Sequence, residues 1–430
     1  VKTTHDMNEL KKSFDKDSWQ YAYLNSEEGY SSDGLYEKIS IINQYELGMT
    51  KDKEEYDKNK SEYEKVVKTI KDGDWKDIVN AQKEESEKEL KEIEEQIKFF
   101  DSIPDDLSPT EKKNTIEQLN VAKKAAEEDL EMVNYRLDHD IGYNHPLNYS
   151  LVMYYNNKSQ AESYEKQDVS KLKSDEYDFY VQTKTAAAKY KYYLDNNIAY
   201  TENSMTNNDI VQYFFSEYSF IILVFVLMVS GSIVSQEFSK GTIKLLLIKP
   251  YKRWKILLSK YLAVLTSIVL ITVVLLGMQL IVGGLMLDFE SLKVPVFYYS
   301  YVGDKVITVN LFTYWFKSFL ANMPIWIIVG TLSFAASTLF SNTALAVIVG
   351  FVGQTGLSII TSLLESRITS YWWAKYFIGF HIDFSPYVFG SKPLIEDFTL
   401  CFSSCVWLVY FLIMKIVSFV YFTKRDIKNV

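Results

Sequence analysis

The sequence predicts an α-helical integral membrane protein that also carries a mainly α-helical, coiled-coil-like domain in water. Five apolar segments after residue 209 reach the roughly 20 residues that a bilayer-crossing helix needs. Before residue 210, apolar residues recur every three or four positions, as in amphipathic helices. Residues 1–209 hold 29 Lys and Arg against 45 Asp and Glu, whereas residues 210–430 hold 17 against 10. We therefore expect two domains, the first acidic and the second basic at its edges.

Residues 42–137 are expected to form long amphipathic helices along three apolar seams. The seams are Ile42, Tyr45, Met49, Tyr56, Tyr63, Val66 and Ile70, then Leu90, Ile93, Ile97 and Phe100, and then Ile116, Leu119, Ala126, Leu130, Val133 and Leu137. Residues 103–107 interrupt the pattern, and Ser108, Pro109 and Glu111 restart it as N-cap, first-turn proline and capping-box acid. The last two seams therefore predict a helical hairpin with arms of about 25 residues, or about 40 Å.

The remainder of the first domain is less regular. Residues 141–175 contain Pro146, many Asn and a cluster of Tyr, which favours a few strands there, and residues 176–200 return to a helical pattern. Thr206 and Asp209 offer a capped helix start. A helix over 210–225 would then run directly into the bilayer and couple the two domains rigidly.

The spans predicted after residue 209 are 211–235, 256–284, 311–339, 343–364 and 400–422. The loop 236–255 holds six Lys and Arg against the single acid Glu237, which places it on the cytoplasmic side. Because five crossings put the two ends on opposite sides, the basic C-terminal tail lies in the cytoplasm and residues 1–209 lie outside the cell. The expected location is the bacterial plasma membrane.

An outer domain needs an export signal, and the chain opens with Val1. We expect a first span and a short cytoplasmic start ahead of residue 1. A cleaved signal peptide is the alternative.

No catalytic chemistry is expected within this chain. It lacks the Gly-x-x-x-x-Gly-Lys-[Ser/Thr] phosphate loop, so ATP hydrolysis would have to come from another chain. Cys401 and Cys405 share one helix face, so no disulfide is expected. The histidines are scattered without metal-ligand spacing, at His5, His139, His145 and His381. We expect no metal site, no cofactor and no nucleic-acid partner.

Polar residues inside the spans are few, and packing is the expected role of most. Lys415 lies about two turns from the cytoplasmic end of the last span, close enough for its amine to snorkel to the interface. Gln279, Asn322, Gln354 and Thr355 suit span interfaces or a pathway. The aromatic run 365–389 is too charged to span and predicts an aromatic belt at the outer interface.

The loop after the first span has its own pattern. Ile243, Leu246 and Leu247 recur at helical spacing, and Gly241 and Pro250 bracket them. This pattern predicts a short amphipathic helix across the membrane face. A plain positive-inside anchor is the alternative.

The order of residues in this loop resembles the signature that follows the second span in permeases of the ABC-2 type, a family of ABC exporters. The matching features are Glu237, Gly241, Thr242, the apolar run Leu245 to Ile248, Pro250, Arg253 and Lys260. The resemblance implies a coupling helix at about 237–250 that docks on a separate ATP-binding subunit, which would hold ATP and Mg²⁺. It also implies six spans with an insertion allowed between the first two, and a second permease subunit. The coupling residues it implies are Glu237, Phe238, Gly241, Thr242, Lys244, Leu245, Leu246, Pro250 and Arg253.

The function expected from this resemblance is export of a peptide, lipid or drug-like substrate through a permease dimer, identical or mixed, in the lipid bilayer. The alternative is a complex that transmits force or a signal through its extracellular stalk without transport. A third possibility is that the acidic outer domain captures cationic peptides by long-range attraction.

Overall fold

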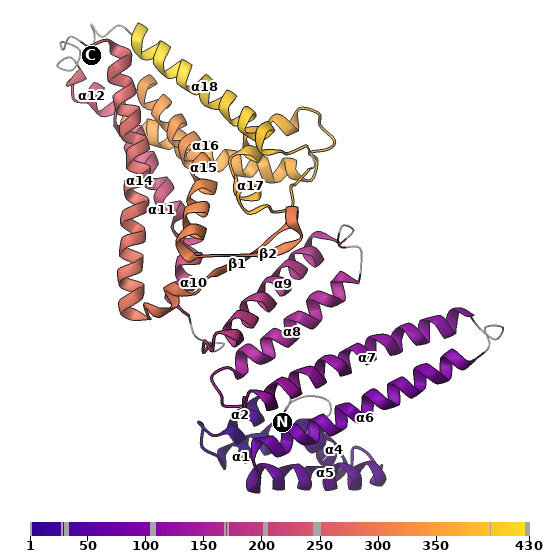
Figure 1. The fold of residues 1–430 in the computed structure, drawn as a ribbon. Helices are drawn as coiled ribbons and strands as arrows, with labels where there is room; N and C mark the ends of the chain where they lie inside the picture. The colour runs from indigo at the N-terminus through magenta and orange to yellow at the C-terminus, as the bar shows by residue number, and fades with distance from the viewer. Residues whose placement is uncertain are drawn as a thin grey trace. The chain divides into compact units, whose positions relative to one another are not determined.

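The computed structural model describes residues 2–425, apart from 27–28, 30–33, 104–108, 167–168, 170–171, 201–204, 244–250 and 396. The chain divides into two compact units, Val1–Ser204 and Met205–Val430 (Figure 1). The division falls five residues before the predicted one, because Asn208 is hydrogen-bonded to Ser291 and Val294 of the second unit.

The regular secondary structure in the described residues of the first unit is helical, with turns between the helices. Its helices are α1 (Lys2–Lys12), α2 (Trp19–Asn25), α4 (Leu35–Glu46), α5 (Lys53–Asp72), α6 (Trp75–Ser102), α7 (Pro109–Asp138), α8 (Asn148–Glu165) and α9 (Ser174–Asp195). A core with fully buried Met7, Leu24, Ile70 and Val79 joins α1, α2, α5 and α6. The predicted helical domain is therefore confirmed.

The spacing of the first apolar seam suggested one helix, but the structure divides this seam between α4 and α5. The chain breaks after Glu46, and Gly48 adopts a φ of 72°, a left-handed conformation that ends a helix and favours glycine. Asp52 then caps α5 by accepting a hydrogen bond from the Glu55 N–H. Because α5 packs back on α4, Tyr45 and Tyr56 stack with their ring centroids 4.3 Å apart.

The predicted helical hairpin is confirmed in α6 and α7, which pack along each other. Asp74 and Asp77 form a capping box at the start of α6, and Pro109 is the first residue of α7. The N-cap predicted at Ser108 lies outside the described residues.

The prediction of a few strands in 141–175 was wrong. Residues 148–165 form α8, which pairs with α9. Tyrosines that suggested strands fill the helix interface instead, as where Tyr149 meets Tyr190 edge to face at 5.9 Å. Tertiary packing thus overrides a weak local preference.

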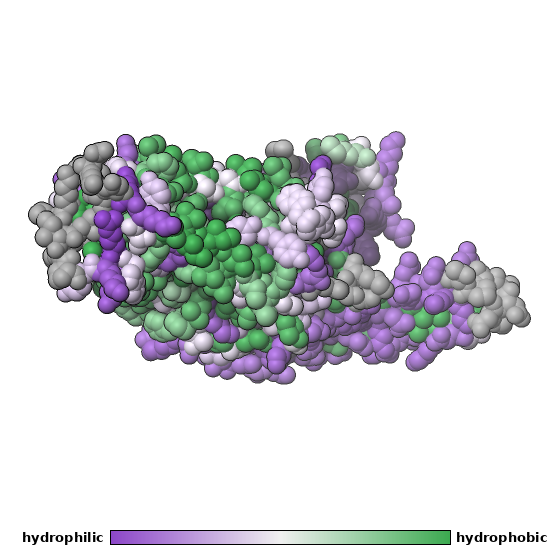
Figure 2. Space-filling model, turned by 90° about the horizontal axis from the view of Figure 1, so that it is seen from above, coloured by the Kyte–Doolittle hydropathy of each residue, from purple (hydrophilic) through white to green (hydrophobic). Residues whose placement is uncertain are grey.

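The second unit contains the spans. Its elements are α10 (Asn207–Gln212), α11 (Phe214–Ser232), α12 (Ser235–Ser239), α14 (Arg253–Met286), β1 (Val296–Ser300), β2 (Lys305–Val309), α15 (Leu311–Leu339), α16 (Thr343–Glu365), α17 (Ser385–Phe389) and α18 (Leu400–Lys424). Among the described residues, five helices are long and apolar enough to cross a membrane: α11, α14, α15, α16 and α18. This agrees with the five predicted spans. Figure 2 shows hydrophobic residues gathered on the surface of this unit.

Helix α15 is the centre of the bundle and packs against α11, α16 and α18. Its Trp326 and Phe334 are fully buried. Two glycines let the helices approach closely, because a Cβ at Gly350 would lie 2.4 Å from Leu227, and one at Gly231 would lie 2.7 Å from Val347. Ser333 crosses the same contact and donates to the carbonyls of Leu227 and Ala346.

The helix predicted to continue from 210 to 225 is interrupted at Tyr213, which separates α10 from α11. The capping box of Thr206 and Asp209 is present as expected. Asn208 ties α10 to the loop after α14, so α10 is a separate element. The rigid link proposed between the domains would run through residues 201–204, which lie outside the described residues.

A β-hairpin between α14 and α15 was not predicted. Strands β1 and β2 pair antiparallel in a register that joins Val296 to Val309 and Ser300 to Lys305. Alternating aromatic and β-branched residues around Gly303 were the available signal. The hairpin and α10 lie at the end of the bundle opposite α12 (Figure 1).

Residues 366–399, here called the aromatic segment, do not span. They form two 3₁₀ turns and α17, and pack on α15 and α18. Trp372 is 80% exposed, and Tyr371, Trp373 and Tyr376 are also exposed. The segment docks on α15 near Pro324, where the Phe384 N–H donates to the Ala321 carbonyl. Trp407 of α18 donates to the Pro324 carbonyl beside it.

Candidate functional site

The predicted coupling element begins in α12, directly after α11, where α14 begins and α18 ends (Figure 1). The backbone N–H groups of Val234 and Ser235 both donate to Ser337 Oγ, at 3.2 and 2.9 Å. Ser235 Oγ also donates to the Gly231 carbonyl at 2.6 Å. These bonds fix the sharp turn from α11 into α12 on the end of α15.

Glu237 and Lys260 form an ion pair across this turn. Lys260 Nζ lies 2.5 Å from Glu237 Oε1 and also donates to the Ile233 carbonyl at 2.9 Å. The two side chains are only 21% and 13% exposed, so water screens their attraction poorly. The second carboxylate oxygen, Glu237 Oε2, is buried without a hydrogen-bond partner among the described residues.

Two arginines extend the connection to α18 and α15. Arg253, the first residue of α14, donates to the carbonyls of Thr423 and Arg425 at the end of α18. Arg425 donates to the Thr338 carbonyl and to Ser341 Oγ, and its guanidinium lies 4.1 Å from the centre of the Phe238 ring. We call Glu237, Phe238, Arg253, Lys260 and Arg425 the α12 anchor.

Of the predicted coupling residues in the α12 anchor, Phe238 lies in the interior of the bundle end, whereas Glu237 and Arg253 are partly buried. Phe238 is 2% exposed and meets Phe422 edge to face, so it packs against this chain itself. Gly241 has a φ of 69°, and Thr242 Oγ1 donates to the Glu237 carbonyl at 3.5 Å. The other predicted residues, Lys244, Leu245, Leu246 and Pro250, lie outside the described residues.

From the sequence, Lys260 was identified as part of the motif but not as the partner of Glu237, and no role was predicted for Arg425 or Ser337. Glu237 is the single acid in a basic loop, which was a signal that it needs a nearby cation. Nothing local indicates Ser337 or Arg425, because both reach α12 from more than 80 residues away.

Lys415 does not snorkel, contrary to the prediction. Its amine is buried, with no hydrogen-bond acceptor among the described residues, and lies 2.7 Å from the centre of the Tyr261 ring. The rings of Phe334, Phe411 and Phe419 lie 5.0 to 5.9 Å away. The amine is therefore enclosed by aromatic rings of α14, α15 and α18 and does not reach the interface.

The aromatic segment contains a second buried polar cluster. His381 Nε2 lies 2.8 Å from the Lys375 carbonyl, and Nδ1 lies 2.8 Å from Ser403 Oγ. A carbonyl only accepts, so Nε2 carries the proton and Nδ1 accepts from Ser403. Tyr387 O–H can then donate to Ser403 Oγ at 2.5 Å. This chain of bonds joins the segment to α18 through a neutral imidazole.

We expect the pH dependence of stability to report this cluster. Burial lowers the pKa of His381 from its ordinary value of 6.5, and the bond to the Lys375 carbonyl offsets only part of that effect. The contribution of neutral His381 to the free energy of unfolding is therefore full above pH 6.5, and it declines as the pH falls through the lowered pKa of the folded protein. Between pH 7.5 and pH 5, the midpoint of thermal unfolding should fall less for His381→Gln than for the wild type. Parallel pH profiles would contradict the assignment.

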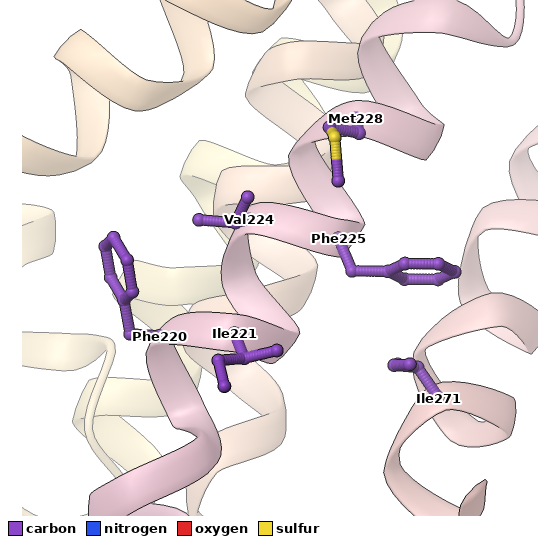
Figure 3. Close-up of a pocket in the computed structure, with 6 residues that line it drawn as sticks. All are labelled: Phe220, Ile221, Val224, Phe225, Met228 and Ile271. Atoms are coloured by element: carbon purple, nitrogen blue, oxygen red, sulfur yellow. The ribbon is translucent and has the colours of Figure 1, made fainter. Parts of the chain in front are cut away.

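A groove of about 260 Å³ lies between α11 and α14. Most of its lining residues come from α11, including Phe220, Phe225 and Met228, and Ile271 comes from α14, as Figure 3 shows. Its lining holds no polar side chain, so it suits hydrocarbon and not a charged ligand. Within the described part of the chain, no group of His, Cys, Asp and Glu could hold a metal ion.

The chain is similar to two proteins of Bacillus subtilis. Over 243 residues the chain is 31% identical to "Uncharacterized protein YhcI" of Bacillus subtilis (strain 168), a match that covers 55% of this chain and 74% of the relative. Over 204 residues it is 29% identical to "Uncharacterized membrane protein YdbK" of the same organism, covering 47% and 76%. No solved structure matches significantly.

The similarity to a membrane protein and the five apolar helices identify a multi-pass membrane protein. A family model matches residues 179–428, from α9 to the end of α18. Because this match covers more than half of the sequence, the chain belongs to the family described as "Protein of unknown function (DUF2705)".

Proposed function

We propose that this chain is the membrane-spanning permease subunit of an ABC-2 type exporter, driven by a separate subunit that binds ATP and Mg²⁺. The observation that carries the proposal is the α12 anchor, which ties a five-residue helix to α14, α15 and α18. A partner that pushes on α12 would therefore displace several spanning helices together. This is the mechanical requirement of a coupling element.

The surface available to such a partner is polar and basic. Gln236, Ser239, Lys240 and Thr242 are exposed around α12, and the basic loop continues beyond them. In this proposal the loop faces the cytoplasm and residues 1–204 lie outside the cell. Acidic groups on the ATP-binding subunit would complement the loop, while the Glu237–Lys260 pair would transmit the displacement.

A second permease subunit would complete the pathway. Helix α16 is the least enclosed span and exposes Thr355, Ser358 and Ser362 on its surface. Hydroxyl groups on a spanning helix favour a protein neighbour over lipid. The substrate class that fits an ABC-2 exporter is a peptide, a lipid or a drug-like molecule.

Gly241 provides the direct test. Proline at 241 cannot adopt the φ of 69° and would lose the N–H that donates to the Phe238 carbonyl. We expect Gly241→Pro to abolish ATP-driven flux of a labelled substrate in vesicles that contain the chain and the ATP-binding subunit that purifies with it, with ATP hydrolysis retained. Gly241→Asn is the matched control, because asparagine tolerates this conformation. Normal flux in the proline variant, or absence of any ATPase from the purified complex, would refute the proposal.

A force-transmitting complex is the second candidate, favoured by the 28- and 30-residue helices α6 and α7. The same vesicles separate the two functions. Flux supports export, whereas ATP hydrolysis with no flux, together with activation of an external protein, supports force transmission.

A further inference from the structure

A basic cavity lies in the first unit, between α1, the turn that follows it, and α2. Its volume is about 490 Å³, which is within the range of small-molecule sites. The polar lining residues are His5, Asn8, Lys11, Lys12, Lys16 and Asn25. None of its eight lining residues carries a carboxylate.

Helical spacing builds one wall of this cavity. His5, Asn8 and Lys12 lie at positions i, i+3 and i+7 of α1, which places their side chains on one face. Lys11 extends the same wall beside Asn8. Phe14 and Tyr21 form an apolar side.

The lysines are held in different ways. Lys11 is only 8% exposed, and its Nζ donates to Asn25 Oδ1 at 2.8 Å. Lys12 pairs with Glu9 on the surface at 2.7 Å. Lys16 is exposed and makes no ion pair with any described residue. The cavity thus joins one enclosed ammonium, that of Lys11, to two exposed ones, of which Lys12 would have to exchange its surface pair with Glu9 for the ligand.

The charge of the surroundings makes this concentration of cations informative. Residues 1–209 hold 45 acidic side chains against 29 Lys and Arg, so a cavity lined only by basic and neutral groups departs from the domain average. Three ammonium groups around one space exceed what a single carboxylate requires. They match an anion of two or more charges, for which lysine is a common point-charge ligand.

We propose that this cavity binds a phosphate-bearing ligand, held by Lys11, Lys12 and Lys16, with Asn8 donating from its amide, Asn25 positioning Lys11, and Tyr21 packing beside the ligand. The site is separate from the α12 anchor and does not depend on the exporter proposal. Its ligand chemistry is a phosphate group with two or more negative charges, either in a free diphosphate or as a phosphomonoester on a lipid headgroup.

Calorimetric titration of the full chain, in nanodiscs of phosphatidylcholine, with inorganic pyrophosphate tests the site. The wild type should bind one equivalent, and Lys12→Gln with Lys16→Gln should weaken binding about tenfold or more. Lys53→Gln with Lys58→Gln is the matched control, because it removes the same charge from α5, and it should bind as the wild type does. Asn25→Asp, which places a carboxylate beside Lys11, should abolish binding.

A second arm identifies the source of the phosphate. Hydrogen exchange over residues 2–25 should slow on adding pyrophosphate if the ligand is free, and on changing to nanodiscs that contain phosphatidic acid if the ligand is a headgroup. The proposal is overturned if neither phosphate source affects the wild type. It is equally overturned if both double variants lose binding alike, because the attraction would then be diffuse.

Discussion

Lys260→Met is expected to lower the free energy of unfolding of the full chain by about 2–3 kcal/mol, because it leaves the Glu237 carboxylate enclosed without its cation. This loss of unfolding free energy is smaller than that expected for a deeply buried ion pair, because both side chains are partly exposed to solvent. The Ile233 carbonyl also loses its donor. Reversible unfolding in mixed micelles, followed by tryptophan fluorescence, measures the effect. Under the exporter proposal, this variant should also lose most ATP-driven flux.

Lys252→Met is the control for this experiment. Lys252 belongs to the same basic loop and is exposed, so its loss should change the unfolding free energy by less than about 0.5 kcal/mol. Exchanging the charges with Glu237→Lys and Lys260→Glu should recover part of the loss, but not the bond to Ile233. Equal stability of the two methionine variants would show that the ion pair contributes nothing.

Gly350→Val is expected to have a still larger effect, about 3 kcal/mol or more, because the bundle has no room at this position. A Cβ there would meet Leu227 at 2.4 Å and Ser333 Cβ at 2.8 Å, and two branched methyl groups would extend further. Helices α11, α15 and α16 would have to separate, which would also break the bonds that Ser333 makes.

The same helix offers the matched control. A Cβ at Gly356 meets nothing within 4 Å, so Gly356→Val changes the same residue type on α16 without a clash. We expect Gly350→Val to lower the thermal midpoint strongly while Gly356→Val stays close to the wild type. Similar midpoints would mean that α16 does not pack as described.

The sequence was sufficient where one local pattern decides the structure. The five spans follow from apolar length, and α6 with α7 follows from spacing and a breaking segment. The sequence was insufficient where a short break in a helix or a contact between distant residues decides the structure. Gly48 turns a continuous seam into α4 and α5, and Tyr213 interrupts a helix because Asn208 is bonded to a loop more than 80 residues away.

The candidate site divides in the same way. Glu237, Gly241 and Arg253 could be selected from the order of residue types in one loop. Their partners could not, because Ser337 and Arg425 acquire their roles only when α15 and α18 end beside α12. Lys415 was misjudged for a related reason, since its distance from the chain end suggested water while four aromatic rings enclose it.

The docking of the aromatic segment on α15 has a consequence for how that part of the bundle can open. Phe384 of the segment donates to the Ala321 carbonyl and Trp407 of α18 donates to the Pro324 carbonyl, so the segment and α18 are both attached to α15 where a proline weakens the helical hydrogen bonding. If the aromatic segment moved alone, it would lose the Phe384 bond. If α15 bent at the proline, the segment could move with the helix and keep this bond, and α18 would be drawn along through Trp407.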